Sequence, residues 1–158
     1  MNSNITRNLL GIAAMLFALA MPLHAQASHC STATSAGSWA YTYTGSIITA
    51  NGPAPAASVG RYTQDAAGNV TGSQTRSVAG ASGVEEISGT LSVNPDCTGT
   101  ATINVFVNGQ LQRTAILALV YDSNSNHLRM IFQSLTLPDG TNVPVVLTVD
   151  ANRQVTKD

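Results

Sequence analysis

The stretch GSWAYTYTG, residues 37–45, decides the fold. It places an aromatic ring on every second position, at Trp39, Tyr41 and Tyr43. Because successive side chains of a β-strand point to opposite faces, these three rings share one face. The stretch therefore predicts a strand whose aromatic face is directed toward a core.

The same period of two continues along the rest of the chain, in which Ser, Thr, Gly, Asn and Val dominate and no helical periodicity stands out. The pattern predicts eight strands, over residues 38–45, 57–64, 69–77, 84–93, 100–107, 110–121, 127–137 and 142–149. The connection 46–56 contains two prolines and is predicted to be a long, mobile loop.

Short turns rich in Gly, Asn and Asp separate most of these strands, and Asn108-Gly109 is the strongest hairpin signal. Short turns make consecutive strands antiparallel neighbours, since a parallel crossover needs about a dozen residues or more. Only closure removes both edge strands of such a meander. We therefore predict an all-β fold, an eight-stranded antiparallel up-and-down barrel, with a β-sandwich as the alternative.

Two features of the sequence resemble the calycin superfamily of barrels. Gly37-Ser38-Trp39 opens the first predicted strand, and Arg153 follows the last one. In lipocalins, which belong to that superfamily, such residues pack together at one end of the barrel. The resemblance implies that Gly37, Trp39 and Arg153 close the barrel, with the guanidinium across the indole ring. The run VGRYTQDAAGNVTGSQT, residues 59–75, looks more like the allene oxide cyclase barrel-like branch and its small exported bacterial relatives.

The first residues have the three parts of a secretory signal peptide. Arg7 precedes an apolar run over 9–23, and Ala25-Gln26-Ala27 forms a small-residue cleavage site. The run is shorter than the roughly 20 residues that a membrane helix needs. We expect residues 1–27 to be removed and 28–158 to form one β-barrel domain, located in the periplasm or outside the cell.

Two cysteines remain in the expected mature domain, Cys30 and Cys97. An exported protein favours a disulfide between them, and two free thiols are the alternative. Zinc needs more ligands than this pair and the adjacent His29 supply, so no metal site is predicted.

Charge and motifs disfavour several classes of function. Without Arg7, six basic residues face eight acidic ones, a net charge of −2, so nucleic-acid binding is disfavoured. No phosphate loop, nucleotide fingerprint or calcium loop is present, and we expect no cofactor. His29 and His127 belong to no Ser, His and Asp order that indicates a triad, so we predict no catalytic residue.

The candidate site follows from alternation. Glu85-Glu86 must place one carboxylate inside a regular barrel, where it needs a cationic partner. We assign the inward position to Glu86, with arginines of the second and third strands as partners. The predicted ligand-binding residues are Tyr41, Tyr43, Arg61, Arg76 and Glu86. The alternatives are that these charges lie on the outer wall and that the tyrosines only fill the barrel.

The sixth and seventh predicted strands are apolar on both faces, over 115–120 and at Ile131, Leu135 and Leu137. Such strands should be covered on both sides. We expect a second copy of the chain to cover them, giving a homo-oligomer. Membrane insertion is disfavoured, because the second to fourth strands carry charges where a lipid-facing band would lie.

Together these features predict an exported barrel that binds a small, mostly apolar molecule without catalysis. One alternative is a cyclase-type enzyme that orients a reactive substrate in the lumen. The other is a structural or adhesive exported protein that has a solid core and no ligand.

Overall fold

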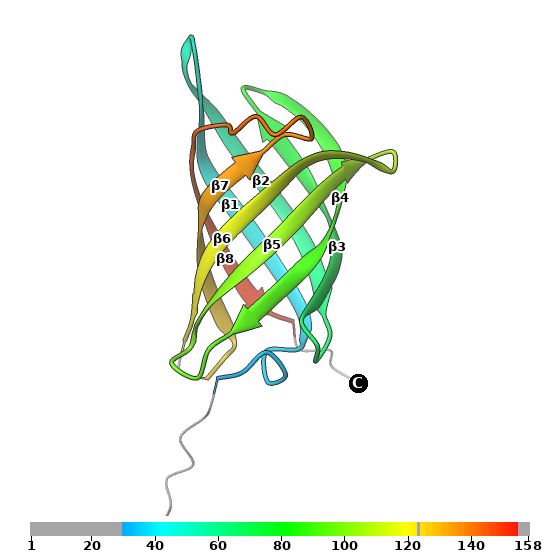
Figure 1. Cartoon of the computed structure of the whole chain (residues 1–158), viewed down its shortest axis with the longest axis vertical. Coiled ribbons are helices and arrows are strands. Elements are labelled where there is room, and N and C mark those ends of the chain that lie inside the picture. The colour runs from blue at the N-terminus through cyan, green and yellow to red at the C-terminus, as the bar shows by residue number, and fades with distance from the viewer. Residues whose placement is uncertain (1–29, 123, 155–158) are drawn as a thin grey trace, which may run out of the picture.

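Eight antiparallel strands close into a barrel in the computed structural model, which describes residues 30–122 and 124–154 (Figure 1). The strands are β1 (Gly37–Thr49), β2 (Gly52–Gln64), β3 (Asn69–Val78), β4 (Ala81–Val93), β5 (Thr98–Val107), β6 (Gln110–Tyr121), β7 (His127–Thr136) and β8 (Val145–Arg153). Each strand pairs with the next, and β8 pairs with β1. The predicted meander and its closure are confirmed, and the sandwich alternative is wrong.

The predicted loop 46–56 is instead the outer half of the β1–β2 hairpin, so that prediction is wrong. Pairing between the two strands continues as far as Thr49 and Gly52, and the hairpin projects beyond the barrel rim (Figure 1). β2 pairs with β3 only from Ala56 onward. The two prolines therefore lie where the ladder with β3 has ended, although the N–H of Ala79 still donates to the Pro55 carbonyl, and there a missing proline N–H costs little.

The end of the barrel opposite this hairpin is closed by Trp39, which has no exposed surface. The Arg153 guanidinium lies over the indole, with its carbon 5.1 Å from the ring centroid. The same guanidinium donates hydrogen bonds to the carbonyls of Thr34 and Ala36, at 2.8 and 2.9 Å. The contact between Trp39 and Arg153 is the one that the calycin resemblance implies, and β8 includes Arg153 rather than ending before it.

Two further aromatic rings pack against Trp39 and form, with it, the floor of the barrel at its closed end. Tyr62 stacks on Trp39 at a centroid distance of 6.2 Å, and Tyr121 meets the indole edge-on at 5.6 Å. Gly37 has a φ of 145°, and a Cβ atom there would lie 3.3 Å from Nη1 of Arg153. A glycine at this position thus lets the guanidinium approach the backbone.

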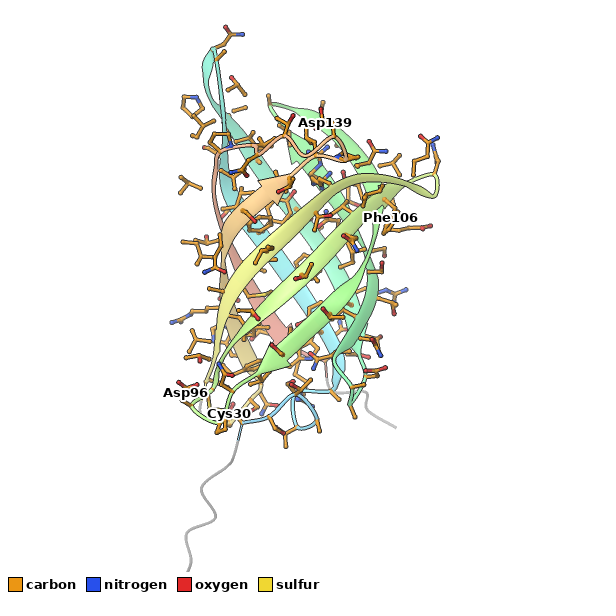
Figure 2. The ribbon with its side chains drawn as sticks, in the orientation of Figure 1. Cys30, Asp96, Phe106 and Asp139 are labelled. Carbon is orange, nitrogen blue, oxygen red and sulfur yellow. A yellow bond between two sulfur atoms is a disulfide. The ribbon has the colours of Figure 1, made fainter. Side chains whose placement is uncertain are left out.

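A disulfide joins Cys30 to Cys97 at the closed end, as predicted, with 5.0 Å between the Cα atoms. Figure 2 shows Cys30 next to the turn that carries Asp96, far from Asp139 at the opposite end. The bond ties the segment before β1 to the β4–β5 turn, and it is compatible with an oxidising compartment. The predicted signal peptide and His29 lie outside the described residues. Within those residues, no helix is long and apolar enough to span a membrane.

The outer wall of β6 and β7 is apolar, with Ile116, Val120 and Ile131 exposed by 42%, 48% and 49%. Leu135, predicted to share this outer face, is buried inside the barrel instead. The pairing skips Gln133, because Ile116 is opposite Ser134 while Leu117 is opposite Phe132. This bulge inserts one residue and reverses the alternation after it, so Leu135 points inward although Ile131 points outward.

Candidate functional site

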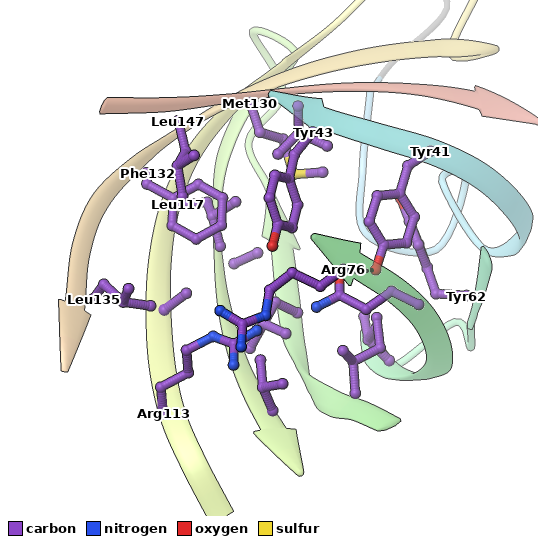
Figure 3. A pocket seen from close by; sticks show the side chains of 18 of the residues that line it. Tyr41, Tyr43, Tyr62, Arg76, Arg113, Leu117, Met130, Phe132, Leu135 and Leu147 are labelled. Atoms are coloured by element: carbon purple, nitrogen blue, oxygen red, sulfur yellow. Dashed lines mark hydrogen bonds between the residues drawn. The ribbon is translucent and has the colours of Figure 1, made fainter. Parts of the chain in front are cut away.

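An apolar cavity of about 70 Å³ lies in the lumen (Figure 3). All eight strands contribute to its lining, as expected where inward residues alternate along every strand. Its apolar residues are Ile47, Val70, Ile87, Leu91, Ala101, Ile103, Val105, Ala115, Leu117, Met130, Phe132, Leu135, Leu147 and Val149. One water-sized sphere needs roughly 10–15 Å³, so the cavity has room for roughly five to seven heavy atoms.

A carboxylate, that of Glu85, is buried in the wall of this lumen and is only 3% exposed. Both of its oxygens accept hydrogen bonds from Arg113, at 2.8 Å from Nη1 and 2.5 Å from Nη2. Nε of Arg76 lies 2.9 Å from Oε1 of the same carboxylate. The paired fork geometry explains how a charge is kept inside an apolar barrel.

A hydrogen-bonded chain extends from this carboxylate across the lumen. Gln74 donates its amide N–H to Oε2 of Glu85 at 2.6 Å. The amide oxygen of Gln74 accepts hydrogen bonds from the hydroxyls of Tyr41, at 2.8 Å, and Ser58, at 3.1 Å. With Arg113, five strands, β1 to β4 and β6, therefore meet in one polar network.

The environment sets the charge state of each group. Burial raises the pKa of Glu85, but the hydrogen bonds and charge of Arg113, with the contacts of Gln74 and Arg76, together hold it below its ordinary value. Burial raises the pKa of Tyr41 far above its ordinary value, and burial also raises that of Tyr43. At neutral pH the network therefore holds a carboxylate, two guanidinium groups and neutral phenols.

Three of the five predicted ligand-binding residues, Tyr41, Tyr43 and Arg76, line the cavity. The predicted lumen positions of Arg61 and Glu86 are wrong, because both side chains are exposed on the outer wall. There they flank Ser73, which pairs with both of them.

The inward acid is Glu85 because it is opposite Gln74, which points into the lumen. The sequence carries a signal for this choice. Glu85 lies on the same strand face as the apolar residues Ile87 and Leu91, whereas Glu86 lies on the face that carries serine and threonine. Arg113 was also missed, although it alternates in step with Ala115.

No group of three or more His, Cys, Asp or Glu side chains that could hold a metal ion occurs in the described part of the chain. His127 lies outside the lumen, where its Nε2 is 2.7 Å from a carboxylate oxygen of Asp150. Comparisons with protein families, curated proteins and solved structures found no match for this chain. We therefore infer function from the lumen.

Replacing Glu85 by glutamine should change how the free energy of unfolding depends on pH. A carboxylate whose folded-state pKa lies below the ordinary value of 4.5 stabilises the fold fully above that pH. This stabilisation is lost as the pH falls through the lower folded-state value. The difference in unfolding free energy between the wild type and Glu85→Gln should therefore shrink as the pH falls below 4.5, as measured by urea titrations at a series of pH values.

The matched control is Glu86→Gln, which removes the neighbouring exposed charge from the outer wall. The difference in unfolding free energy between this variant and the wild type should stay nearly constant over the same pH range. A constant gap for Glu85→Gln as well would contradict a stabilising, ionised Glu85.

Proposed function

We propose that this chain is an exported calycin-like barrel, of the periplasm or extracellular space, that binds a small, mostly apolar molecule in its lumen. One observation carries the proposal: an apolar cavity remains in a barrel whose other end is packed shut around Trp39. Ligand sites are typically concave and apolar with a few polar groups that fix orientation. The disulfide supports export, because such bonds persist in oxidising compartments.

Binding is favoured over a solid structural core because the lumen retains open volume beside polar groups. Binding is favoured over catalysis because the polar groups of the lumen are already engaged in hydrogen bonds with one another. Glu85 accepts hydrogen bonds from both nitrogens of the Arg113 fork and from Gln74. A carboxylate kept ionised by such partners is a weak general base, since its pKa lies far from neutral pH.

A cyclase-type enzyme is the second candidate, and one observation favours it. Glu85 is a buried acid and Arg113 is a partly buried arginine, and both lie beside open volume. A barrel of this kind would act mainly by orienting its substrate, with the guanidinium polarising a carbonyl. Turnover of a bound carbonyl compound by the wild type, lost in an Arg113→Met variant whose spectrum is still that of the folded barrel, would establish this candidate over simple binding.

The binding proposal is tested by filling the cavity. Ala115 is buried and lines it, so Ala115→Leu should place additional carbon atoms in the space a ligand occupies. At about 0.8 kcal/mol per displaced methylene, we expect affinity for hexan-1-ol to fall at least about tenfold. Affinity is measured by NMR titration of the amide signals of cavity-lining residues.

The matched control is Ala118→Leu, an equal change on the outer wall of the same strand. This variant should bind hexan-1-ol as the wild type does. Shifts that do not saturate in the wild type, or that are the same in Ala115→Leu, would reject lumen binding. A folded spectrum of Ala115→Leu is required for the comparison, since overpacking costs about 1–3 kcal/mol.

A further inference from the structure

We propose that the lumen selects a singly charged anion with a short apolar body, and that Arg76 contacts its negative group. This inference rests on the proposed binding function and names the chemical class of its ligand. It is carried by the charge balance of the lumen and by the unequal use of its two guanidinium groups.

Among the residues that the structure describes, the charges in and beside the cavity do not balance. Arg76 and Arg113 bring two positive charges, and Glu85 brings one negative charge. The tyrosines are neutral at the pH of any host compartment, because burial raises their pKa values. The lumen therefore carries an excess of one positive charge, held by the partly exposed Arg76 beside the apolar lining. A ligand with one negative charge neutralises it.

The two arginines are not equally available to a ligand. Both Nη1 and Nη2 of Arg113 are bound to Glu85, and its side chain is 11% exposed. Arg76 uses only Nε for that carboxylate and is 31% exposed. Within the described residues its two Nη groups have no hydrogen-bond partner. They form the end of a planar fork that matches a carboxylate.

Glu85 acts here as a positioning residue. Its Oε1 holds Nε of Arg76, which fixes how the far end of that guanidinium is directed. In Figure 3 the Arg76 and Arg113 side chains lie beside each other, with Tyr43 near them. Tyr43 thus offers a neutral hydroxyl close to where the anion would lie, and a phenol donates readily to a carboxylate.

The position of this cluster sets the shape of the ligand. Arg76 is two residues from the end of β3, at the end of the barrel opposite Trp39. Apolar side chains such as Leu117, Phe132 and Leu147 line the remaining space. A volume of about 70 Å³ has room for roughly five to seven atoms, so a short-chain carboxylate matches the cavity.

The test compares hexanoate with hexan-1-ol, which differ in the charged head and share the apolar chain. NMR titrations would be run at neutral pH and fixed ionic strength on the wild type, Arg76→Gln and Arg61→Gln. The wild type should prefer hexanoate by about tenfold or more, as expected for charge-assisted hydrogen bonds. Arg76→Gln should lose this preference and keep its affinity for hexan-1-ol.

Arg61→Gln removes the same charge from the outer wall of the adjacent strand and should keep the preference for hexanoate. Arg76→Lys, which restores the charge without the fork, should recover part of it. Equal affinities of the wild type for both compounds, or a preference that survives in Arg76→Gln, would overturn this inference and leave lumen binding intact. Binding of neither compound would overturn the proposed function itself.

Discussion

Replacing Arg113 by methionine is expected to lower the free energy of unfolding by about 3–5 kcal/mol, because it leaves a buried carboxylate without its main partner. Glu85 is 3% exposed and receives hydrogen bonds from both Nη atoms of Arg113. Arg76 and Gln74 remain, but each contacts only one carboxylate oxygen. Methionine matches the length of the arginine stem, so the loss of charge dominates the loss of packing.

The measurement is urea denaturation at neutral pH, followed by circular dichroism. Arg129→Met is the control, since Arg129 lies exposed on the outer wall of β7 and its replacement should change stability by less than about 0.5 kcal/mol. Adding Glu85→Met to Arg113→Met should recover much of the loss, because a buried ion pair exchanged for apolar side chains is often nearly neutral. A cost of Arg113→Met no larger than that of Arg129→Met would mean that the pair contributes little.

The barrel could be predicted from the sequence because the signals that specify its strands and turns lie within short segments of the chain. Alternation identifies strands, and short turns such as Asn108-Gly109 force consecutive strands to pair. Two of the errors arise where the neighbouring strand determines the structure. The prolines of 46–56 are tolerated because β3 ends before it reaches them, and Leu135 turns inward because of the bulge at Gln133. Neither the length of a partner strand nor a bulge leaves a signal within the segment itself.

The site was predicted only in part for a related reason. Alternation along their strands places Tyr41, Tyr43 and Arg76 on the inward face, and all three line the cavity. Choosing between Glu85 and Glu86 required the register of β4 against β3, and alternation of Glu85 with Ile87 was the available signal. The pairing of Glu85 with Arg113 joins strands that are not adjacent in the barrel. Contact between β4 and β6, which both pair with β5, depends on two successive registers and on side-chain packing, which no local pattern encodes.

The disulfide variant Cys30→Ala/Cys97→Ala is expected to lose about 4 kcal/mol of unfolding free energy. The cysteines are 67 residues apart, so the bond closes a long loop and restricts the unfolded chain. Thermal and urea unfolding of the wild type and the double variant would measure the difference. Adding a reductant should destabilise the wild type by a similar amount and leave the double variant unchanged.

A second measurement separates the unfolded-state effect from damage to the closed end. The single tryptophan, Trp39, donates its indole N–H to the carbonyl of Ser35, in the segment that the disulfide anchors at Cys30. Arg153 holds the same segment through Thr34 and Ala36. These contacts should keep the floor closed without the disulfide, so the fluorescence spectrum of folded Trp39 should stay that of a buried indole. A red-shifted spectrum in the folded double variant would show that the bond holds the floor together, and the lost stability would then belong to the native state.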